Sequence, residues 1–222
     1  MKMRVVLALM AVGVVLASAA LAAEPDPGTP AGAQRIVRAA AEKGDRSEVR
    51  RFFHATTPTE EKVADALAEY SVAGAAAYKA AASKYGDDES RKTLFGVVPI
   101  QPKEADEAKI QWKIEGNKAT PVATDKNNNF AGPPLMKIDG VWTMPMSDIV
   151  SGRSEAEINQ TVLVPLHKQS ELMSACAKDT ADGKYATAAD LRKALLEQLQ
   201  AMKRDIEQQA TTQAAATKPS RK

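Results

Sequence analysis

Two adjacent hairpin signals near the middle of the chain constrain its fold more than any other feature of the sequence. In the stretch PLMKIDGVWTMPM, residues 134–146, Asp139-Gly140 separates two apolar runs, and Asp-Gly is a favoured pair for a tight type I′ turn. The stretch AKIQWKIEGNKATPVAT before it alternates apolar and polar residues around a second turn, Gly116-Asn117. Because such alternation gives one apolar face, we expect a small antiparallel sheet that helices must cover.

Three helices are expected before these strands. The first ends at Gly44, the second opens with a capping pattern at Asp45, and the third runs from Thr57 to Gly86. The apolar side of the second helix is formed by Val49, Phe52 and Phe53. These helices supply a cover for the sheet, so the sequence predicts an α+β fold with N-terminal helices packed on the strands.

Two further helices are expected after the strands. Ser154 and Glu157 form a capping box, and the helix that they open contains Pro165, which is expected to kink it. After a break at Asp182-Gly183, the last helix carries a narrow apolar stripe of Leu191, Leu195, Leu199, Met202 and Ile206. Such a stripe packs on one partner helix. That partner is either the preceding helix, in a C-terminal helical hairpin, or another protein, including a second copy in a dimer.

The first residues of the chain predict export. Lys2 and Arg4 precede an uncharged run, Val5 to Ala23, that ends in small residues, as in a secretory signal peptide cleaved after Ala22 or Ala23. A retained membrane anchor is the alternative, because the run approaches the length of a spanning helix. No cysteine follows the run, so a lipid anchor is not expected. We expect a periplasmic or extracellular protein without a membrane span once the signal peptide is removed.

Composition divides the chain into a signal peptide at 1–22, a flexible Pro- and Gly-rich leader at 23–33, a single α+β domain at 34–210 and a disordered tail at 211–222.

Cys176 is the only cysteine, so no intramolecular disulfide forms, and its place on an apolar helix face predicts burial.

The charge balance gives no indication of a polyanionic partner. The chain has 30 Lys and Arg against 28 Asp and Glu, and loss of Lys2 and Arg4 with the signal peptide leaves 28 of each. A neutral protein is not steered to nucleic acid or to anionic lipid.

Two stretches of the sequence resemble a known superfamily. The stretch AAAEKGDRSEVRRFF, followed by a capped helix, and the later stretch KIDGVWTM are similar to the nuclear-transport-factor-2-like superfamily of cystatin-like α+β domains. The resemblance covers roughly half of the mature chain and is carried by Gly44, Asp45, Phe52, Phe53, Asp139, Gly140 and Trp142. It implies a small α+β domain with a cone-shaped pocket, in a fold that hosts enzymes, binders and structural modules. Two long helices follow the last strand here, where members of that superfamily usually end.

Familiar motifs for catalysis, metal binding or cofactor binding do not occur in the sequence. The only histidines are His54 and His167, and there is no G-x-S-x-G motif, phosphate-binding glycine loop or dinucleotide fingerprint. His167 and Glu171 lie four residues apart on a helix, but a zinc site needs more ligands, so an ordinary surface pair is the simpler interpretation. We therefore assign no catalytic residue, no metal and no cofactor.

Trp112 and Trp142 are the candidate ligand-binding residues. Both belong to expected strands and would line a concave face of the sheet, or else fill the core between sheet and helices. The sequence favours a non-catalytic module of the cell envelope that binds a small molecule or a protein. One alternative is an enzyme of the nuclear-transport-factor-2-like type that acts on a small apolar substrate, with a carboxylate or His54 as base. Another is a helical adaptor or chaperone-like protein.

Overall fold

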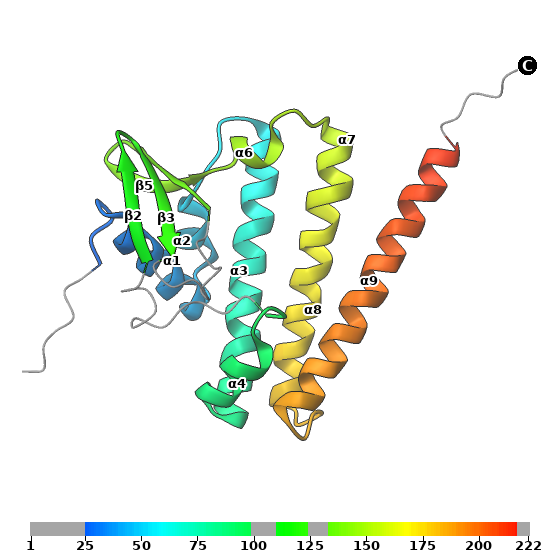
Figure 1. The fold of residues 1–222 in the computed structure, drawn as a ribbon. Coiled ribbons are helices and arrows are strands. Elements are labelled where there is room, and N and C mark those ends of the chain that lie inside the picture. Colours follow the sequence, from blue (N-terminus) through cyan, green and yellow to red (C-terminus); the bar gives the residue numbers. More distant parts are fainter. Residues whose placement is uncertain (1–24, 99–109, 124–132, 217–222) are drawn as a thin grey trace, which may run out of the picture.

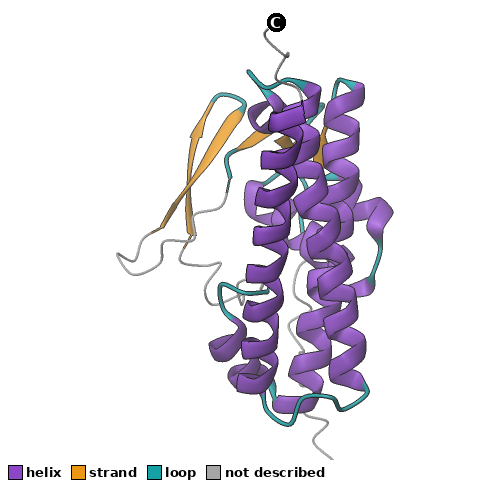
Figure 2. Cartoon of the chain, turned by 90° about the vertical axis from the view of Figure 1, so that its right-hand side faces the viewer, coloured by secondary structure: helices purple, strands orange, loops and turns teal. Residues whose placement is uncertain are grey.

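A sheet lies beside a bundle of long helices in the computed structural model, which describes residues 25–98, 110–123 and 133–216 (Figure 1). The expected signal peptide and the start of the leader lie outside the described residues. The long helices are α3 (Pro58–Tyr85), α8 (Val164–Ala181) and α9 (Ala188–Ala216). Seen from the side, the strands stand off to one side of these helices (Figure 2). The α+β class is confirmed.

The sheet has five strands in the order β1-β5-β4-β3-β2. Four of them form two antiparallel hairpins: β2 (Ile110–Glu115) with β3 (Lys118–Ala123), and β4 (Leu135–Ile138) with β5 (Val141–Pro145). The second hairpin turns at Asp139 and Gly140, whose φ angles of 50° and 84° are both positive. Two successive positive φ angles are what a type I′ turn requires, so the Asp-Gly signal predicted this turn correctly.

The first helix, α1 (Pro30–Lys43), begins earlier than expected. The hydroxyl of Thr29 accepts a hydrogen bond from the backbone N–H of Gly32 at 3.1 Å, and a proline occupies the first helical turn. The boundary predicted for the leader, residues 23–33, is therefore too late, because its last four residues are helical. The signal is a Thr-Pro pair, the same pair that opens α3 at Thr57.

The next two elements also differ from expectation at their shared boundary. The helix α2 (Arg46–Arg51) opens where the carboxylate of Asp45 accepts from the backbone N–H of Glu48 at 3.0 Å. It ends before Phe52, and β1 (Phe53–His54) then pairs in parallel with the end of β5. The sheet is therefore mixed rather than antiparallel. A strand this short is too brief to show the alternation by which strands are recognised in a sequence.

One continuous helix follows the sheet and consists of three segments. A separate short turn, α6 (Ser147–Val150), precedes its first segment, α7 (Glu155–Ile158), whose capping box at Ser154 is formed as expected. A π-helical turn, η1 (Asn159–Leu163), then connects α7 to α8. Pro165 follows at the start of α8, where its missing N–H and its ring disturb the regular α pattern. The helix accommodates the proline by widening for one turn instead of breaking.

The C-terminal helices form a hairpin only in part. The helix α8 packs most extensively on α3 and also contacts α9, so it lies between these two helices (Figure 1). The start of α9 packs on α8 and on α4 (Asp87–Leu94), and its far end diverges from them. Leu191 and Leu195 are buried, whereas Leu199, Met202 and Ile206 are partly exposed. The helix continues to Ala216, so residues 211–216 of the expected disordered tail are helical.

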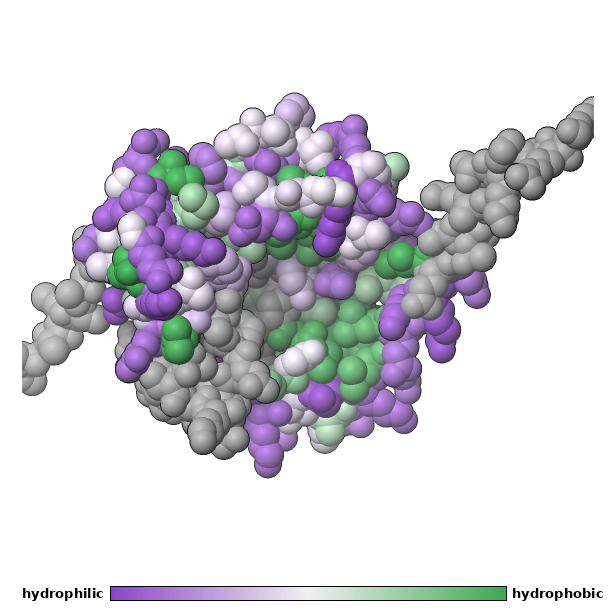
Figure 3. All heavy atoms as spheres, turned by 45° about the horizontal axis from the view of Figure 1, so that its top comes forward, coloured by the Kyte–Doolittle hydropathy of each residue, from purple (hydrophilic) through white to green (hydrophobic). Residues whose placement is uncertain are grey.

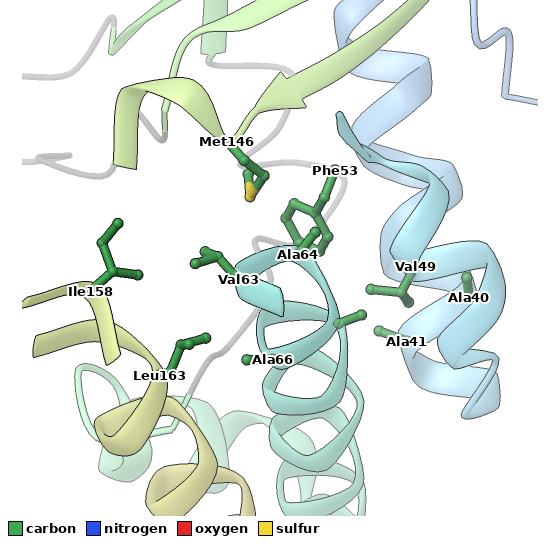
Figure 4. Close-up of a cluster of buried hydrophobic side chains, with 11 residues drawn as sticks. Ala40, Ala41, Val49, Phe53, Val63, Ala64, Ala66, Met146, Ile158 and Leu163 are labelled. Atoms are coloured by element: carbon green, nitrogen blue, oxygen red, sulfur yellow. The ribbon is translucent and has the colours of Figure 1, made fainter. Parts of the chain in front are cut away.

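Three clusters of buried apolar side chains hold these elements together. The first joins the end of the sheet to the start of α3: Figure 4 shows Met146, which follows β5, directed toward Phe53 and Val63. The second lies inside the bundle and includes Leu94, Met173, Cys176, Leu191 and Leu195. The third lies under the sheet and consists of Ala33, Ala119, Leu135 and Trp142. The first cluster therefore fixes the sheet relative to the bundle.

The face of the molecule in Figure 3 combines a hydrophilic rim with an apolar hollow. On the face shown in Figure 3, apolar residues gather in a hollow between the sheet side and the α9 side of the molecule. Within residues 25–98, 110–123 and 133–216, no helix has both the length and the apolar character of a membrane span.

Candidate functional site

A cavity of about 470 Å³ lies between the β4–β5 hairpin and the first two helices. Its volume is within the range of sites for small organic ligands. Most of its wall is apolar and comes from Pro27, Ala33, Ile36, Val37, Phe52, Ile138, Val141 and Trp142. The cavity therefore combines side chains from segments that are about one hundred residues apart in the sequence.

The pairing of β1 with β5 explains why this cavity exists. The backbone of β1 reaches only the last residues of β5, where Phe53 lies opposite Met144. Earlier in β5, the backbone N–H of Trp142 donates instead to the carbonyl of Pro27 at 3.4 Å. The indole Nε1–H of Trp142 donates to the carbonyl of Gly28 at 2.9 Å. Because β1 is so short, the first half of β5 borders an opening between the sheet and α1.

The two candidate tryptophans lie on the same face of the sheet but have different surroundings. Residues opposite each other in paired strands, and residues two apart in one strand, share a face of the sheet. Trp112 lies opposite Pro121 on β3, and Ala119, two residues from Pro121, lies opposite Leu135 on β4. The residue two positions after Leu135 lies opposite Trp142 on β5, so both tryptophans are on one face. Trp142 is 3% exposed and lines the cavity, whereas Trp112 is half-buried against the same cluster and is not part of the lining. Ligand binding by either tryptophan stays a prediction.

Five polar side chains complete the lining: Glu48, Arg51, His54, Asp139 and Thr143. Arg51 and Glu48 are one turn apart on α2 and form an ion pair, with 2.7 Å between Nη1 and Oε2. The hydroxyl of Thr143 donates to the carbonyl of Met136 at 3.3 Å. The carboxylate of Asp139 and the imidazole of His54 have no hydrogen bond or ion pair to any residue that the structure describes. These two groups are available to a ligand.

The imidazole of His54 is one of the polar groups of the cavity, and it lies near enough to the Glu60 carboxylate on α3 to help lower the pKa of that carboxyl. A histidine that acts as general base is normally oriented by a hydrogen bond from its second ring nitrogen, and this imidazole lacks such a partner among the described residues. Burial raises the pKa of Tyr70, and it raises the pKa of the Cys176 thiol to about 11. Both of these side chains lie in the bundle cluster, outside the cavity. Cys176 is buried, as the sequence predicted.

The other histidine does not belong to this site. His167 is exposed on α8, and its Nδ1 atom lies 3.8 Å from Oε2 of Glu69, so its neighbour is a carboxylate of another helix, α3. Among the described residues, no three His, Cys, Asp or Glu side chains lie close enough together to hold a metal ion.

The sequence identified only part of the cavity. It named Trp142 and His54, and it found the turn that carries Asp139, but it gave no reason to join the α1 residue Ile36 to them. The three-residue spacing of Glu48 and Arg51 is visible in the sequence, yet the same spacing occurs on most charged helix surfaces.

Comparison of the chain with protein families, with curated proteins and with solved structures gives no match. The cavity itself is therefore the basis for inferring a function.

Proposed function

We propose that this protein is an exported, non-catalytic binding protein of the cell envelope, which holds a small and largely apolar molecule in the cavity beside β5. The observation that carries the proposal is a cavity of about 470 Å³ with an apolar wall and a few polar groups. Ligand sites combine these two features, because apolar burial supplies affinity and a few polar groups fix the orientation of the ligand. Export rests on the basic and apolar residues that open the chain.

The nuclear-transport-factor-2-like resemblance belongs to the same proposal. Two facts support it: the cavity lies between N-terminal helices and a sheet, and its lining includes Phe52, Asp139 and Trp142, which carry the resemblance. The resemblance leaves the activity open, since one fold hosts many functions.

The test is to fill the cavity and to measure what the protein holds. Val141 and Val122 are both strand valines with 42% and 44% exposure, and only Val141 lines the cavity. Val141→Trp and Ile36→Trp place an indole in the cavity, whereas Val122→Trp places one on the neighbouring hairpin. Native mass spectrometry of protein purified without denaturation from an exporting host reports any bound small molecule.

Binding in this cavity predicts extra mass on the wild type and on Val122→Trp, and its loss from Val141→Trp and Ile36→Trp. If all four proteins have the bare polypeptide mass, calorimetric titration with a short-chain alkyl alcohol, such as octanol, decides the matter. No binding of the alcohol by the wild type, or equal binding by Val141→Trp and Val122→Trp, contradicts the proposal.

An enzyme is a second candidate, because His54 and two carboxylates, Glu48 and Asp139, share one cavity. A catalytic role for the imidazole predicts that His54→Gln abolishes turnover of a substrate while the ligand still binds. For a binding protein, the same substitution changes affinity alone. Recovery of a chemically altered ligand from the wild type, and of the unaltered ligand from His54→Gln, would favour the enzyme.

A helical adaptor is a third candidate, because the apolar stripe of α9 is buried only in its first half. Met202 and Ile206 keep part of their apolar surface exposed. Dimerisation through this half predicts that Ile206→Lys converts a dimer to a monomer in sedimentation velocity measurements. A monomeric wild type at every concentration tested excludes a dimer through this helix.

A further inference from the structure

We propose that the ligand of this cavity is a cationic amphiphile, an apolar molecule with a protonated amine, and that Asp139 selects it. This inference rests on the proposed binding function and adds the chemical class of the ligand. It follows from the charges of the lining, from their partners and from the place of Asp139 in the hairpin.

The charges of the lining do not cancel. With His54 neutral, two carboxylates and one guanidinium line the cavity, which gives a formal charge of −1. The guanidinium of Arg51 is paired with Glu48, with 2.7 Å between Nη1 and Oε2. Asp139 has no ion pair with any residue that the structure describes, so it holds the unmatched charge. An ammonium group of the ligand would complete this balance, whereas a carboxylate would be repelled.

The hydrogen-bonding groups point to the same class of ligand. The hydroxyl of Thr143 already donates to a backbone carbonyl at 3.3 Å, so its proton is not available to a ligand. A carboxylate only accepts hydrogen bonds, and an ammonium only donates them. The Asp139 side chain therefore suits a donor, and a charged donor forms the stronger bond.

The indole of Trp142 already has a cation beside it. The Nζ atom of Lys137 lies 5.7 Å from the centroid of the Trp142 ring, a distance typical of a cation–π contact. Lys137 is not part of the cavity lining, so it does not occupy the space of the ligand. The Lys137 ammonium is a like charge to an amine ligand, so the amine group is expected at Asp139 and the apolar chain at the indole.

The backbone conformation of Asp139 allows its charge to be removed without a change in the turn. Asp139 has a φ of 50°, a conformation that Asn adopts readily, and Asn-Gly is as favourable a type I′ pair as Asp-Gly. Asp139→Asn therefore removes the charge and keeps the turn. The matched control is Asp148→Asn, which removes one exposed carboxylate on α6, outside the cavity lining.

The probes are octylamine, octanol and octanoate, which share one apolar chain and differ in charge. Isothermal titration calorimetry near neutral pH measures the affinity of each probe for the wild type, Asp139→Asn and Asp148→Asn. Asp139 is exposed, so we expect the wild type to bind the amine about two- to fivefold more tightly than the alcohol, as for an ion pair at the surface, and to bind octanoate most weakly. Asp139→Asn should lose the preference for the amine, and Asp148→Asn should keep it.

The outcomes separate this inference from the function on which it rests. If none of the probes binds, the proposed function fails. If all three bind with equal affinity, or if octanoate binds most tightly, the cavity is a binding site but the cationic ligand class is wrong. If the amine is preferred and Asp139→Asn retains that preference, Asp139 is not the selecting group and the inference is overturned.

Discussion

The two adjacent leucines Leu195 and Leu196 offer a direct test of how α9 is held in the fold. Leu195 is 2% exposed inside the bundle cluster, beside Leu94, Met173 and Cys176, and Leu196 is 37% exposed. Replacement of either leucine by alanine removes the same atoms from the same helix, so the change in helix propensity is the same for both. Any difference between the two variants therefore reports burial.

Loss of a fully buried leucine side chain costs about 2 to 5 kcal/mol, because the removed atoms lose their apolar surroundings and leave a cavity behind. We expect Leu195→Ala to lower the free energy of unfolding by about 3 kcal/mol, and Leu196→Ala to lower it by less than about 1 kcal/mol. For a domain of this size, the larger loss corresponds to a fall in Tm of roughly 6 to 12 °C.

The assay is urea unfolding followed by circular dichroism at 222 nm, with the midpoint and the slope m compared among the three proteins. A lower midpoint at unchanged m for Leu195→Ala, with little change for Leu196→Ala, supports the packing of α9 on α4 and α8. Equal losses for the two variants would refute the reasoning, because they would mean that the first half of α9 is not docked as the structure has it.

Three other predictions concern a turn, a thiol and a buried carboxylate. Gly140 has a φ of 84° and open space where a Cβ would lie, so Gly140→Ala should cost about 1 to 2 kcal/mol through backbone strain alone, against almost no cost for Asp139→Asn, in the same urea assay. Burial raises the pKa of the Cys176 thiol from 9.0 to about 11, so the contribution of the thiol to stability is full below pH 9.0 and is lost as the pH rises toward 11. The difference in unfolding free energy between the wild type and Cys176→Ala should therefore shrink over that pH interval. A constant difference would contradict the burial of the thiol. The backbone N–H of Thr56 donates to the Glu60 carboxylate at 2.6 Å and holds the pKa of that carboxyl below its ordinary 4.5. This contribution to stability is present above pH 4.5 and is lost as the pH falls through the lowered pKa. Glu60→Gln should therefore lose less stability than the wild type when the pH is lowered. Parallel curves of unfolding free energy against pH for the two proteins would contradict the role of this carboxylate.

Local signals in the sequence predicted the elements whose ends depend on neighbouring residues. Thr57 with a following proline, Ser154 with Glu157, and Asp139 with Gly140 each specify a cap or turn through bonds within a few residues. The same local logic would have placed the start of α1 correctly, because Thr29 caps it in the way that Thr57 caps α3.

The strand β1 and the partner of α8 depend on contacts between distant parts of the chain. Phe53 and His54 follow the end of α2 after a single residue, and only their pairing with the distant end of β5 makes them a strand. The end of α9 was expected to be disordered because it has little to bury, yet the helix continues to Ala216. The partner of α8 also depends on the tertiary structure, since the apolar faces of α3 and α9 are both suitable by pattern alone.

The sequence by itself determined the α+β class, the two hairpins, the buried thiol and the starts of α2, α3 and α7, because periodicity and capping act over one or two turns of chain. The tertiary structure alone decided that Trp142 lines a cavity and Trp112 does not, and that Asp139 and the Glu48–Arg51 pair line the same cavity. The physical reason is that a cavity is defined by where packing stops. That boundary was set here by a β1 too short to cover β5, and no local pattern encodes such a length.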